Sequence, residues 1–409
     1  MDSWRRTWWS VWTANFVTSA GIQSFLPFFP SLLEGLGLTD RVEIAVWAGV
    51  LYGAAPLSAA VMSPLWGSLG DRYGRKLMVL RSLLAITVFV GLMAFATAPW
   101  QVLVLRLLQG TFSGFIAPSA TLVSVAAPAS EQGRIAGSLQ TAMAAGSVLG
   151  PLLGGIAALS AGVSSVFLGV AAAALASLIL VWRFAHEDPA HRRGSEGRAS
   201  VAKAVRDARR DFGELWANPR LRAGLGIVFW AAFALGATSP ILELHVRDLV
   251  AGGPEGAAVW TSVLFSASAL VNLLAMPAWG RHGDRVGHGR ALASSALAAA
   301  FALAAQALPF YAALLVARIV FGAALAGSAA CSFGLAAAET PVGRRGGAFG
   351  IVFSARTLAA AVAAPLGGWL AGRLGVPVVL LLCAALLGLA ARGFLTLQRR
   401  PSARNAAGG

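Results

Sequence analysis

The chain has 409 residues, 57% of them hydrophobic and only 12% charged, and its formal net charge is +15 at pH 7. Soluble domains contain roughly 45–50% apolar residues, so the composition excludes an ordinary soluble domain and predicts an integral membrane protein. In a soluble chain this charge would indicate nucleic-acid binding, but here the basic residues lie between long apolar runs, which argues against that function.

Apolar runs of about 20 residues recur along the whole chain, and each is long enough to cross a hydrocarbon core of about 30 Å as a helix. We therefore predict twelve transmembrane helices. In chain order they cover residues 8–33, 46–69, 77–98, 100–126, 135–159, 163–184, 221–246, 257–279, 291–308, 310–338, 347–371 and 375–397. The first run follows Arg5 and Arg6 as in a signal peptide, but it is too long and lacks a small-residue cleavage site, so we expect a retained helix.

The positions of the basic residues predict the orientation of these helices. With a cytoplasmic N-terminus, three arginines lie near outer loops and three lie inside helices, namely Arg41, Arg247 and Arg373, and Arg106, Arg318 and Arg356. The other 26 of the 32 basic residues (32 − 3 − 3) lie in or beside inner loops and tails. This positive-inside bias places both termini in the cytoplasm.

The first helix carries a polar stripe, because Asn15, Ser19 and Gln23 recur every four residues and so share one helical face. A polar stripe at membrane depth predicts the wall of a wet cavity. The alternative is hydrogen bonding between helices of one bundle.

The loop after the second helix, GSLGDRYGRK at 67–76, concentrates charge between two apolar runs. Gly67 and Gly70 remove side chains where helix ends must approach, and Gly74 permits a tight turn. The charged members of the loop are Asp71, Arg72, Arg75 and Lys76. The basic ones suit an anionic leaflet, whereas the carboxylate can accept bonds at a helix junction. We expect a topological anchor that also acts as a conformational latch. The alternative is a positive-inside loop with no switching role.

The fourth and fifth helices carry two further motifs. Arg106 lies about six residues into its helix, with Gln109 one turn later; a charge at that depth should face protein or a cavity rather than lipid. In the fifth helix Gly146, Gly150 and Gly154 form a GxxxGxxxG face, which favours close contact between helices. Pro151 is expected to bend this helix, and Gly155 completes the motif.

The second half of the chain repeats these motifs at a nearly constant offset. Asp284 and Arg285 in GRHGDRVGHGR at 280–290 answer the charged loop, with Asp284 following Asp71 at 284 − 71 = 213 residues. Arg318 answers Arg106 at 212, and Pro365 answers Pro151 at 214. We infer a duplicated six-helix unit with both copies parallel in the membrane. Between the copies, residues 187–220 are polar and rich in Arg, which predicts a basic amphipathic helix on the inner leaflet or a solvated linker.

Two charged residues of the second half are candidates for the transport pathway. Glu243 is the only carboxylate that we place within a helix, near its outer end, where desolvation would suit proton coupling. The alternative for it is an ion pair with Arg247, one turn on. Arg356 lies near mid-membrane, where a charge should face a cavity or a partner.

No enzyme motif is present in the sequence. The five histidines form neither an HExxH motif nor a Cys/His cluster, and no phosphate-binding GxxxxGK[ST] occurs. Cys331 and Cys383 lie in apolar helices and offer no disulfide framework. We expect no catalytic site, no metal and no cofactor.

Three of these motifs resemble those of the major facilitator superfamily. GSLGDRYGRK resembles its signature loop, Leu105-Arg106 with Gln109-Gly110 resembles its fourth-helix motif, and GSVLGPLLGG at 146–155 resembles the fifth-helix motif of its drug:proton antiporters. The order of the motifs, with PFFPSLLEGLG at 27–37 and SPILELHVRDL at 239–249, is most similar to MdtG-type bacterial multidrug exporters. The resemblance covers residues 8 to 397.

The resemblance implies an all-α membrane fold of twelve helices in two pseudo-symmetric six-helix bundles. The expected parts are a first bundle at 1–184, a cytoplasmic linker at 185–220, a second bundle at 221–398 and a cytoplasmic tail at 399–409. It also implies a secondary transporter that exports amphipathic drug-like molecules by alternating access in exchange for protons, acting as a monomer in the bacterial cytoplasmic (inner) membrane. In such a protein Asp71 would bridge the two bundles when the cytoplasmic side is closed.

Three other functions fit the same chain length and composition. They are a lipid or glycolipid flippase, an uptake carrier for a metabolite, and a membrane scaffold that transports nothing. The fifth-helix motif favours export over uptake, and the paired signature loops favour alternating access over an ion channel.

Overall fold

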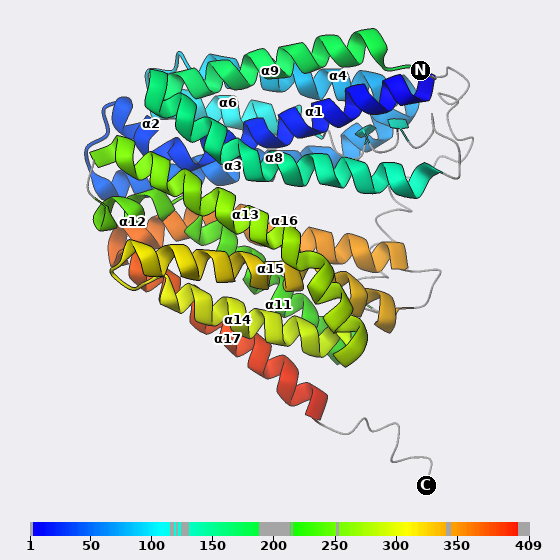
Figure 1. Ribbon diagram of the computed structural model, residues 1–409, viewed down its shortest axis with the longest axis vertical. Coiled ribbons are helices and arrows are strands. Elements are labelled where there is room, and N and C mark those ends of the chain that lie inside the picture. Colours follow the sequence, from blue (N-terminus) through cyan, green and yellow to red (C-terminus); the bar gives the residue numbers. More distant parts are fainter. Residues whose placement is uncertain are drawn as a thin grey trace. The chain divides into compact units, whose positions relative to one another are not determined.

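The computed structural model describes residues 3–114, 118–119, 122–123, 131–187, 213, 216–250, 253–340 and 345–399. Every regular element in these ranges is a helix (Figure 1). The first half of the chain contains α1 (Ser3–Phe25), η1 (Leu26–Phe28), α2 (Phe29–Gly35), α3 (Arg41–Tyr73), α4 (Arg75–Ala85), the π-helical turn η2 (Ile86–Val90), α5 (Gly91–Met93), α6 (Pro99–Thr111), α8 (Gln132–Ala161) and α9 (Val163–Phe184). The second half contains α11 (Pro219–Thr238), α12 (Leu242–Leu249), α13 (Gly253–Val286), α14 (His288–Ala305), α15 (Tyr311–Glu339), α16 (Arg345–Leu374) and α17 (Val376–Arg399).

Ten of the described helical segments are long and apolar enough to cross a membrane, from Trp4–Gly35 at the start to Val376–Gln398 at the end. Two further helices, α6 and α14, occupy the positions of the predicted fourth and ninth spans. The protein is therefore an all-α, multi-pass membrane protein, as the apolar runs predict. The predicted amphipathic helix between the halves falls mostly at 188–212, outside the described residues.

Proline interrupts two of the predicted spans near one end. The first continues from α1 through the 3-10 turn η1, which has Pro27 at its start, into α2. The seventh ends at Thr238, and the short helix α12 begins only at Leu242 because Pro240 lies between them and lacks the N–H that would continue the helix. Glu243 consequently lies in a separate short helix and not within the seventh span.

The duplication is repeated in the backbone. Gly74 and Gly287 have φ of 103° and 91° and lie 287 − 74 = 213 residues apart, and Gly162 and Gly375 have φ of 77° and 84° and lie 375 − 162 = 213 apart. Each of these glycines joins two consecutive helices, in a left-handed conformation that residues with a side chain rarely adopt. The same turns thus recur at the same offset as the motifs.

A side-chain contact is duplicated too. The indole Nε1 of Trp66 donates to the Thr111 carbonyl at 2.6 Å, and the indole Nε1 of Trp279 donates to the Ala323 carbonyl at 2.8 Å. The two tryptophans are 279 − 66 = 213 residues apart. Each bond fastens the charged-loop end of one helix to the arginine-bearing helix of its own half.

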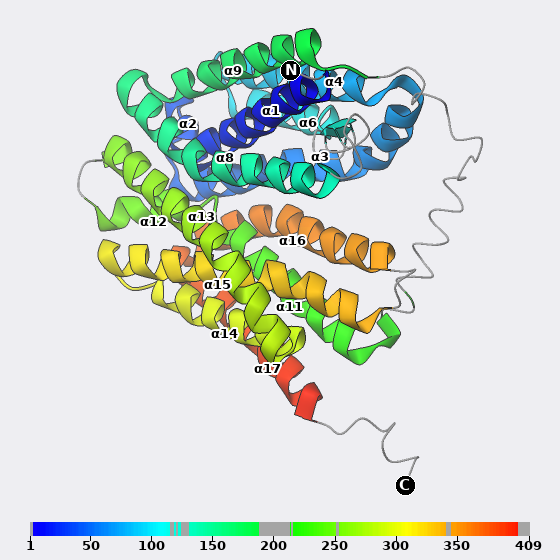
Figure 2. The ribbon, with the colours of Figure 1, turned by 45° about the vertical axis from the view of Figure 1, so that its right-hand side comes forward.

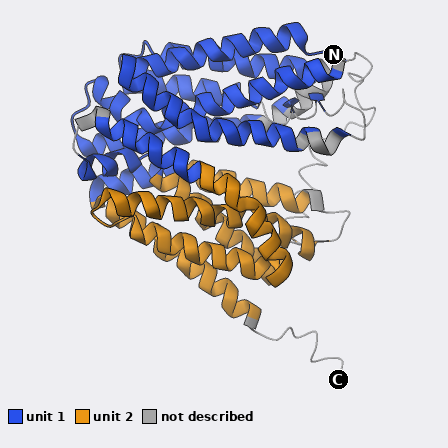
Figure 3. Ribbon diagram, viewed as in Figure 1, with its two compact units in different colours: residues 1–198, 239–269, 364–373 blue, residues 199–238, 270–363, 374–409 orange. Residues whose placement is uncertain are grey.

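Contacts divide the chain into two compact units (Figure 3). Unit 1 comprises residues 1–198, 239–269 and 364–373, and unit 2 comprises residues 199–238, 270–363 and 374–409. Within unit 1, α1 lies beside α8 and α9, and α3 lies beside α6 (Figures 1 and 2). Within unit 2, α14 contacts both α15 and α17. Short segments of the second sequence half therefore belong to unit 1, so the units cut across the sequence halves 1–184 and 221–398.

Candidate functional site

Arg106 is held inside unit 1, where it is 2% exposed. Its Nε donates to the Leu51 carbonyl at 3.1 Å, and its Nη1 donates to the Gln109 amide oxygen at 2.6 Å. The guanidinium also lies 5.5 Å from the ring centroids of both Phe25 and Phe29. Because a charge at this depth is costly without partners, the amide, the carbonyl and the two aromatic faces explain how α6 tolerates it.

The polar stripe of α1 makes its hydrogen bonds within unit 1. Asn15 donates from Nδ2 to the Val11 carbonyl at 2.8 Å, and its Oδ1 accepts from the Ser119 hydroxyl at 3.4 Å. Ser19 donates to the Met143 carbonyl of α8 at 2.7 Å. Gln23, the third member, is half-buried. The contacts of Asn15 and Ser19 correspond to the second interpretation of the stripe, hydrogen bonding inside one bundle.

The glycines of α8 form a tight contact with α1, which we call the α1–α8 seam (Gly146, Gly150 and Gly154). A methyl group on Gly146 would lie 2.7 Å from the Phe16 carbonyl oxygen, and one on Gly150 or Gly154 would overlap the backbone of Ala20 or Ser24. Only glycine permits this approach. Pro151 lies inside the same helix, and Gly155 faces Ser262 of α13 instead of α1.

A second seam joins α3 to α16 inside unit 1. A methyl group on Gly49 would overlap the Ala364 carbonyl, and one on Gly368 would overlap the Ala45 carbonyl. We call this contact the α3–α16 seam. It brings a helix of the first sequence half against one of the second. The sequence analysis noted GG at 367–368 only as part of the repeat, although its glycine and alanine spacing was a signal for close helix contact.

The charged loop is organised by an acid that the sequence analysis did not single out. Glu187 accepts the backbone N–H of Arg75 through Oε1 at 2.7 Å and that of Lys76 through Oε2 at 3.1 Å. The Lys76 ammonium donates to the Trp182 carbonyl at 2.8 Å. Glu187 thus caps α4, where the N-terminal N–H groups favour a negative charge. The side chains of Gly67, Gly70, Asp71 and Arg72 lie outside the described residues, so the latch contact of Asp71 stays a prediction.

The second copy of the loop differs at one informative position. His288 stands where the first copy has Arg75 (288 − 75 = 213). Its Nε2 lies 3.5 Å from Asp284 Oδ1, and a methyl group on Gly283 or Gly334 would overlap its imidazole. Asp284 is 72% exposed and Arg285 is exposed as well. The inserted imidazole therefore fills a glycine-lined slot in unit 2.

A buried ionic cluster lies where α2 meets α12, within unit 1. The side chain of Glu243 is 0% exposed, that of Arg247 is 14% exposed and that of Glu34 is 32% exposed. Arg247 donates from Nη2 to Glu243 Oε1 at 2.7 Å and from Nη1 to Glu34 Oε1. Ser31 donates to Glu243 through its hydroxyl and, at 3.4 Å, through its backbone N–H. One guanidinium thus serves two carboxylates.

A neighbouring pair extends this cluster. Arg41, at the start of α3, donates from Nη1 to Asp248 Oδ1 at 2.7 Å and from Nη2 to the Leu244 carbonyl at 3.1 Å. We call the whole set the α2–α12 network: Ser31, Glu34, Arg41, Glu243, Arg247 and Asp248. Burial raises the pKa of Glu243, against the opposing effects of Arg247 and Ser31. The sequence analysis identified Glu243 with Arg247 as an alternative partner, but not the roles of Ser31 and Asp248.

Arg356 is the other membrane-depth charge of α16. It lies 356 − 347 = 9 residues after the start of its span at Gly347, or about 14 Å along the helix. Its side chain is half-buried, and within the described residues it has neither an ion pair nor a hydrogen bond. An unpaired guanidinium at that depth marks a candidate contact for substrate.

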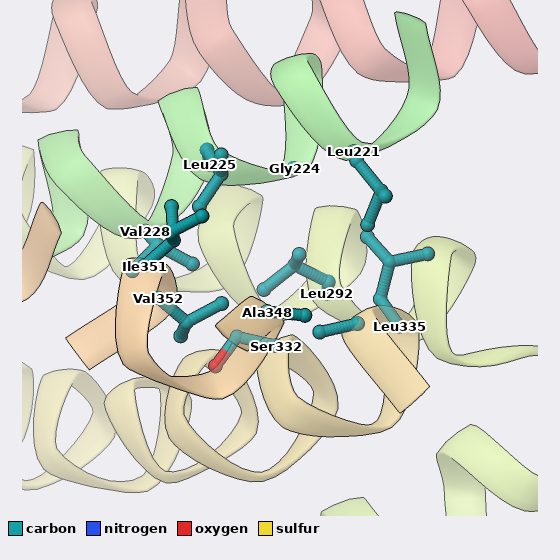
Figure 4. A pocket seen from close by; sticks show the side chains of 11 residues that line it. Leu221, Gly224, Leu225, Val228, Leu292, Ser332, Leu335, Ala348, Ile351 and Val352 are labelled. Carbon is teal, nitrogen blue, oxygen red and sulfur yellow. The ribbon is translucent and has the colours of Figure 1, made fainter. Parts of the chain in front are cut away.

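The described cavities do not coincide with these residues. Figure 4 shows a cavity of about 10 Å³ in unit 2, lined by Leu221, Leu292, Leu335 and Val352 among others. It has room for about one water molecule. In unit 1 a larger hollow of about 310 Å³ lies among Trp4, Trp8, Trp9 and Glu131. No three His, Cys, Asp or Glu side chains of the described residues are grouped to hold a metal ion.

Ten or more apolar helices, a duplicated half and arginines inside the spans define the class of multi-helix membrane transporters. The sequence matches the model of the Major Facilitator Superfamily over residues 11–263 and 252–409, and the chain belongs to this family. It is accordingly a transporter rather than an enzyme, and the resemblance seen in the motifs is confirmed.

Several multidrug resistance proteins are similar in sequence. Multidrug resistance protein MdtG of Proteus mirabilis (strain HI4320) is 32% identical over 293 residues, which cover 71% of this chain and 70% of that protein. Multidrug resistance protein MdtG of Rahnella sp. (strain Y9602) is 33% identical over 293 residues, covering 71% and 68%.

Solved structures with low sequence identity share the fold. A bacterial homolog of the human lysosomal transporter Spinster, in an inward-facing and unoccupied conformation, has a TM-score of 0.74 at 16% identity, covering 98% of this chain and 100% of that one. The nucleoside transporter NupG has a TM-score of 0.76 at 14% identity, with the same coverage. The major facilitator fold is thereby confirmed.

Proposed function

We propose that the protein exports amphipathic drug-like molecules by alternating access, in exchange for protons. The relatives named multidrug resistance protein MdtG support the substrate class. The fifth-helix motif, which forms the α1–α8 seam, supports export over uptake. We further propose a monomer in a bacterial inner membrane with both termini in the cytoplasm, on the positive-inside bias of the loops.

The α2–α12 network is the observation that carries alternating access. It joins Glu34 and Arg41 of the first sequence half to Glu243, Arg247 and Asp248 of the second half through ion pairs. The α3–α16 seam joins the same two halves through small residues. Ion pairs and close backbone contacts that connect two halves can be broken and remade, so they suit one end of a two-state protein. With cytoplasmic termini, this end faces outward.

Arg106, Gln109 and Arg356 are the proposed pathway residues. Arg106 and Gln109 form one hydrogen-bonded pair, so a change at either alters the other. Arg356 is free to meet a substrate, and a guanidinium favours molecules with an acidic or hydrogen-bond-accepting group. Asn15, Ser19 and Gln23 border the α1–α8 seam and would transmit its movement.

Transport by purified protein in liposomes tests this function. With the outside acidic, wild-type protein should move an amphipathic fluorescent dye against its gradient in inside-out vesicles loaded by a pH jump, and collapse of the pH gradient should abolish the movement. Dye movement that ignores the pH gradient would overturn proton exchange. Movement of a short-chain fluorescent lipid without movement of any dye would identify a flippase instead.

A further inference from the structure

The charges of the α2–α12 network do not balance. Arg41 is matched by Asp248, but Arg247 is shared by Glu34 and Glu243. Two cations therefore face three carboxylates, which leaves the network with a net charge of −1. The excess lies on the Glu34, Glu243 and Arg247 group and not on the neighbouring pair.

This imbalance is costly because the group is largely removed from water. Glu243 is 0% exposed and Arg247 is 14% exposed. A buried charge without a full counter-charge is unfavourable, and two carboxylates that share one site favour uptake of a proton by one of them. Burial raises the pKa of Glu243, in the same direction. One proton would make the group neutral and keep every contact of Arg247 possible.

We propose that Glu34 and Glu243 form a shared site for one proton, and that binding of this proton closes the end of the protein at which α2 meets α12. The proposal rests on the proposed alternating access, for which it names the coupling site. Ser31 positions the site, because its hydroxyl and backbone N–H both hold Glu243. The two carboxyl groups titrate as one pair, so the proton belongs to both.

The direction of the pH effect follows from linkage. In the closed state burial raises the proton affinity of the pair, whereas opening exposes both carboxylates to water and lowers it. Protons therefore bind more tightly to the closed state, and lowering the pH favours closure. Raising the pH through the closed-state pKa favours opening, by up to about tenfold per pH unit for one linked proton. An exchanger driven by outside protons needs this order, since proton binding from outside then closes the outer end.

Other titratable groups face the site from the same elements. On α12 these are His245, which is buried, and Asp248. At the start of α3 they are Asp40 and Glu43. Asp40 accepts the backbone N–H groups of Val42 and Glu43 and so caps α3. His245 and Asp248 therefore supply the matched controls.

Distances between paired spin labels test the site without substrate or gradient. Labels at Thr39 and Val250, in full-length protein with Cys331 and Cys383 replaced by Ala and held in nanodiscs, report on the α2–α12 end. Wild-type protein should shift toward the short distance as the pH falls. Glu34→Gln and Glu243→Gln should each lose this dependence and stay closed, because the remaining carboxylate is matched by Arg247. Unchanged pH dependence in either variant would overturn the proposal.

Two controls and a spectroscopic signature sharpen the test. Asp248→Asn and His245→Asn should keep the pH dependence, and its loss in either would place the proton elsewhere. Infrared difference spectra between high and low pH should contain the carbonyl band of a protonated carboxylic acid in wild-type protein. That band should disappear in both Gln variants, and its persistence in both would reject the pair as the site. The spectra are interpreted only for variants that elute as monodisperse protein.

The outcomes separate this proposal from the proposed function. Dye transport driven by a pH gradient, together with pH-independent distances, would leave proton exchange standing and reject this site. Distances that respond to pH only when both carboxylates are present, in a protein that moves no dye, would support the site and reject the exporter.

Discussion

Single arginines inside the spans are accommodated in the same manner in both halves. Arg106 pairs with Gln109 and faces two phenylalanine rings, and Arg318, 1% exposed, lies 3.5 Å from the Gln306 amide oxygen and 5.4 Å from the Phe321 ring centroid. The similarity of the two sites means that burial alone does not distinguish a transport role from a structural one.

Substitution of Arg106 makes that distinction. Arg106→Ala should reduce transport by about tenfold to a hundredfold, the equivalent of one charge-assisted hydrogen bond of about 1.5–3 kcal/mol, while the protein still inserts and folds. Arg106→Lys should also fail, because an ammonium lacks the forked geometry that reaches both Leu51 and Gln109. Initial rates of dye transport, normalised to protein in the vesicles, measure the effect. A loss of the same size in Arg318→Ala would assign both residues to structure, and normal transport by Arg106→Ala would remove it from the mechanism.

Glu187 is the residue on which the start of α4 depends. Glu187→Ala leaves the N–H groups of Arg75 and Lys76 without their acceptor, which should destabilise this helix end by about 0.5–2 kcal/mol. Hydrogen exchange at these two amides should accelerate accordingly, with Glu187→Gln intermediate because an amide has one acceptor oxygen instead of two. Unchanged exchange in Glu187→Ala would mean that water replaces the cap.

At the scale of elements, glycine decides how close two helices come. Gly150→Ala places a methyl group onto the Ala20 backbone of the α1–α8 seam, and such overpacking typically costs about 1–3 kcal/mol. Gly137 lies in the same helix with nothing within 4 Å of an added methyl group, so Gly137→Ala should stabilise α8 by up to about 1 kcal/mol through helix propensity. Thermal unfolding in detergent should move in opposite directions for the two variants. Equal shifts would show that α1 and α8 do not depend on the seam.

At the scale of the whole molecule, the two copies of the charged loop predict unequal roles. Asp71→Asn should favour the form that is open on the cytoplasmic side, shifting populations about tenfold to a hundredfold if one charge-assisted bond of about 1.5–3 kcal/mol is lost. Asp284→Asn should do less, since Asp284 is 72% exposed and lies beside His288 in its own half. Spin labels at Leu77 and Phe349 would measure the cytoplasmic distance. An unchanged distribution in Asp71→Asn would make the loop an anchor and not a latch.

Sequence patterns by themselves determined the class of the molecule, its spans and its duplication. Hydrophobic length, the spacing of glycines and the offset near 213 are local properties of the chain, since a bilayer and a close helix contact constrain each segment separately. The breaks at Pro27 and Pro240 were missed because the apolar runs continue through them, although proline was the available signal.

Only the tertiary structure decided which charges meet. Ser31 and Glu243 are 212 residues apart, and Glu34 and Arg247 are 213 apart, so no local pattern connects them. Arg75 and Glu187, 112 residues apart, pair only because α4 and α9 lie together. A sequence states which side chains carry charge, whereas the balance of one arginine against two carboxylates arises from how the helices bring distant segments into contact, because electrostatic interaction depends on separation in space and on burial.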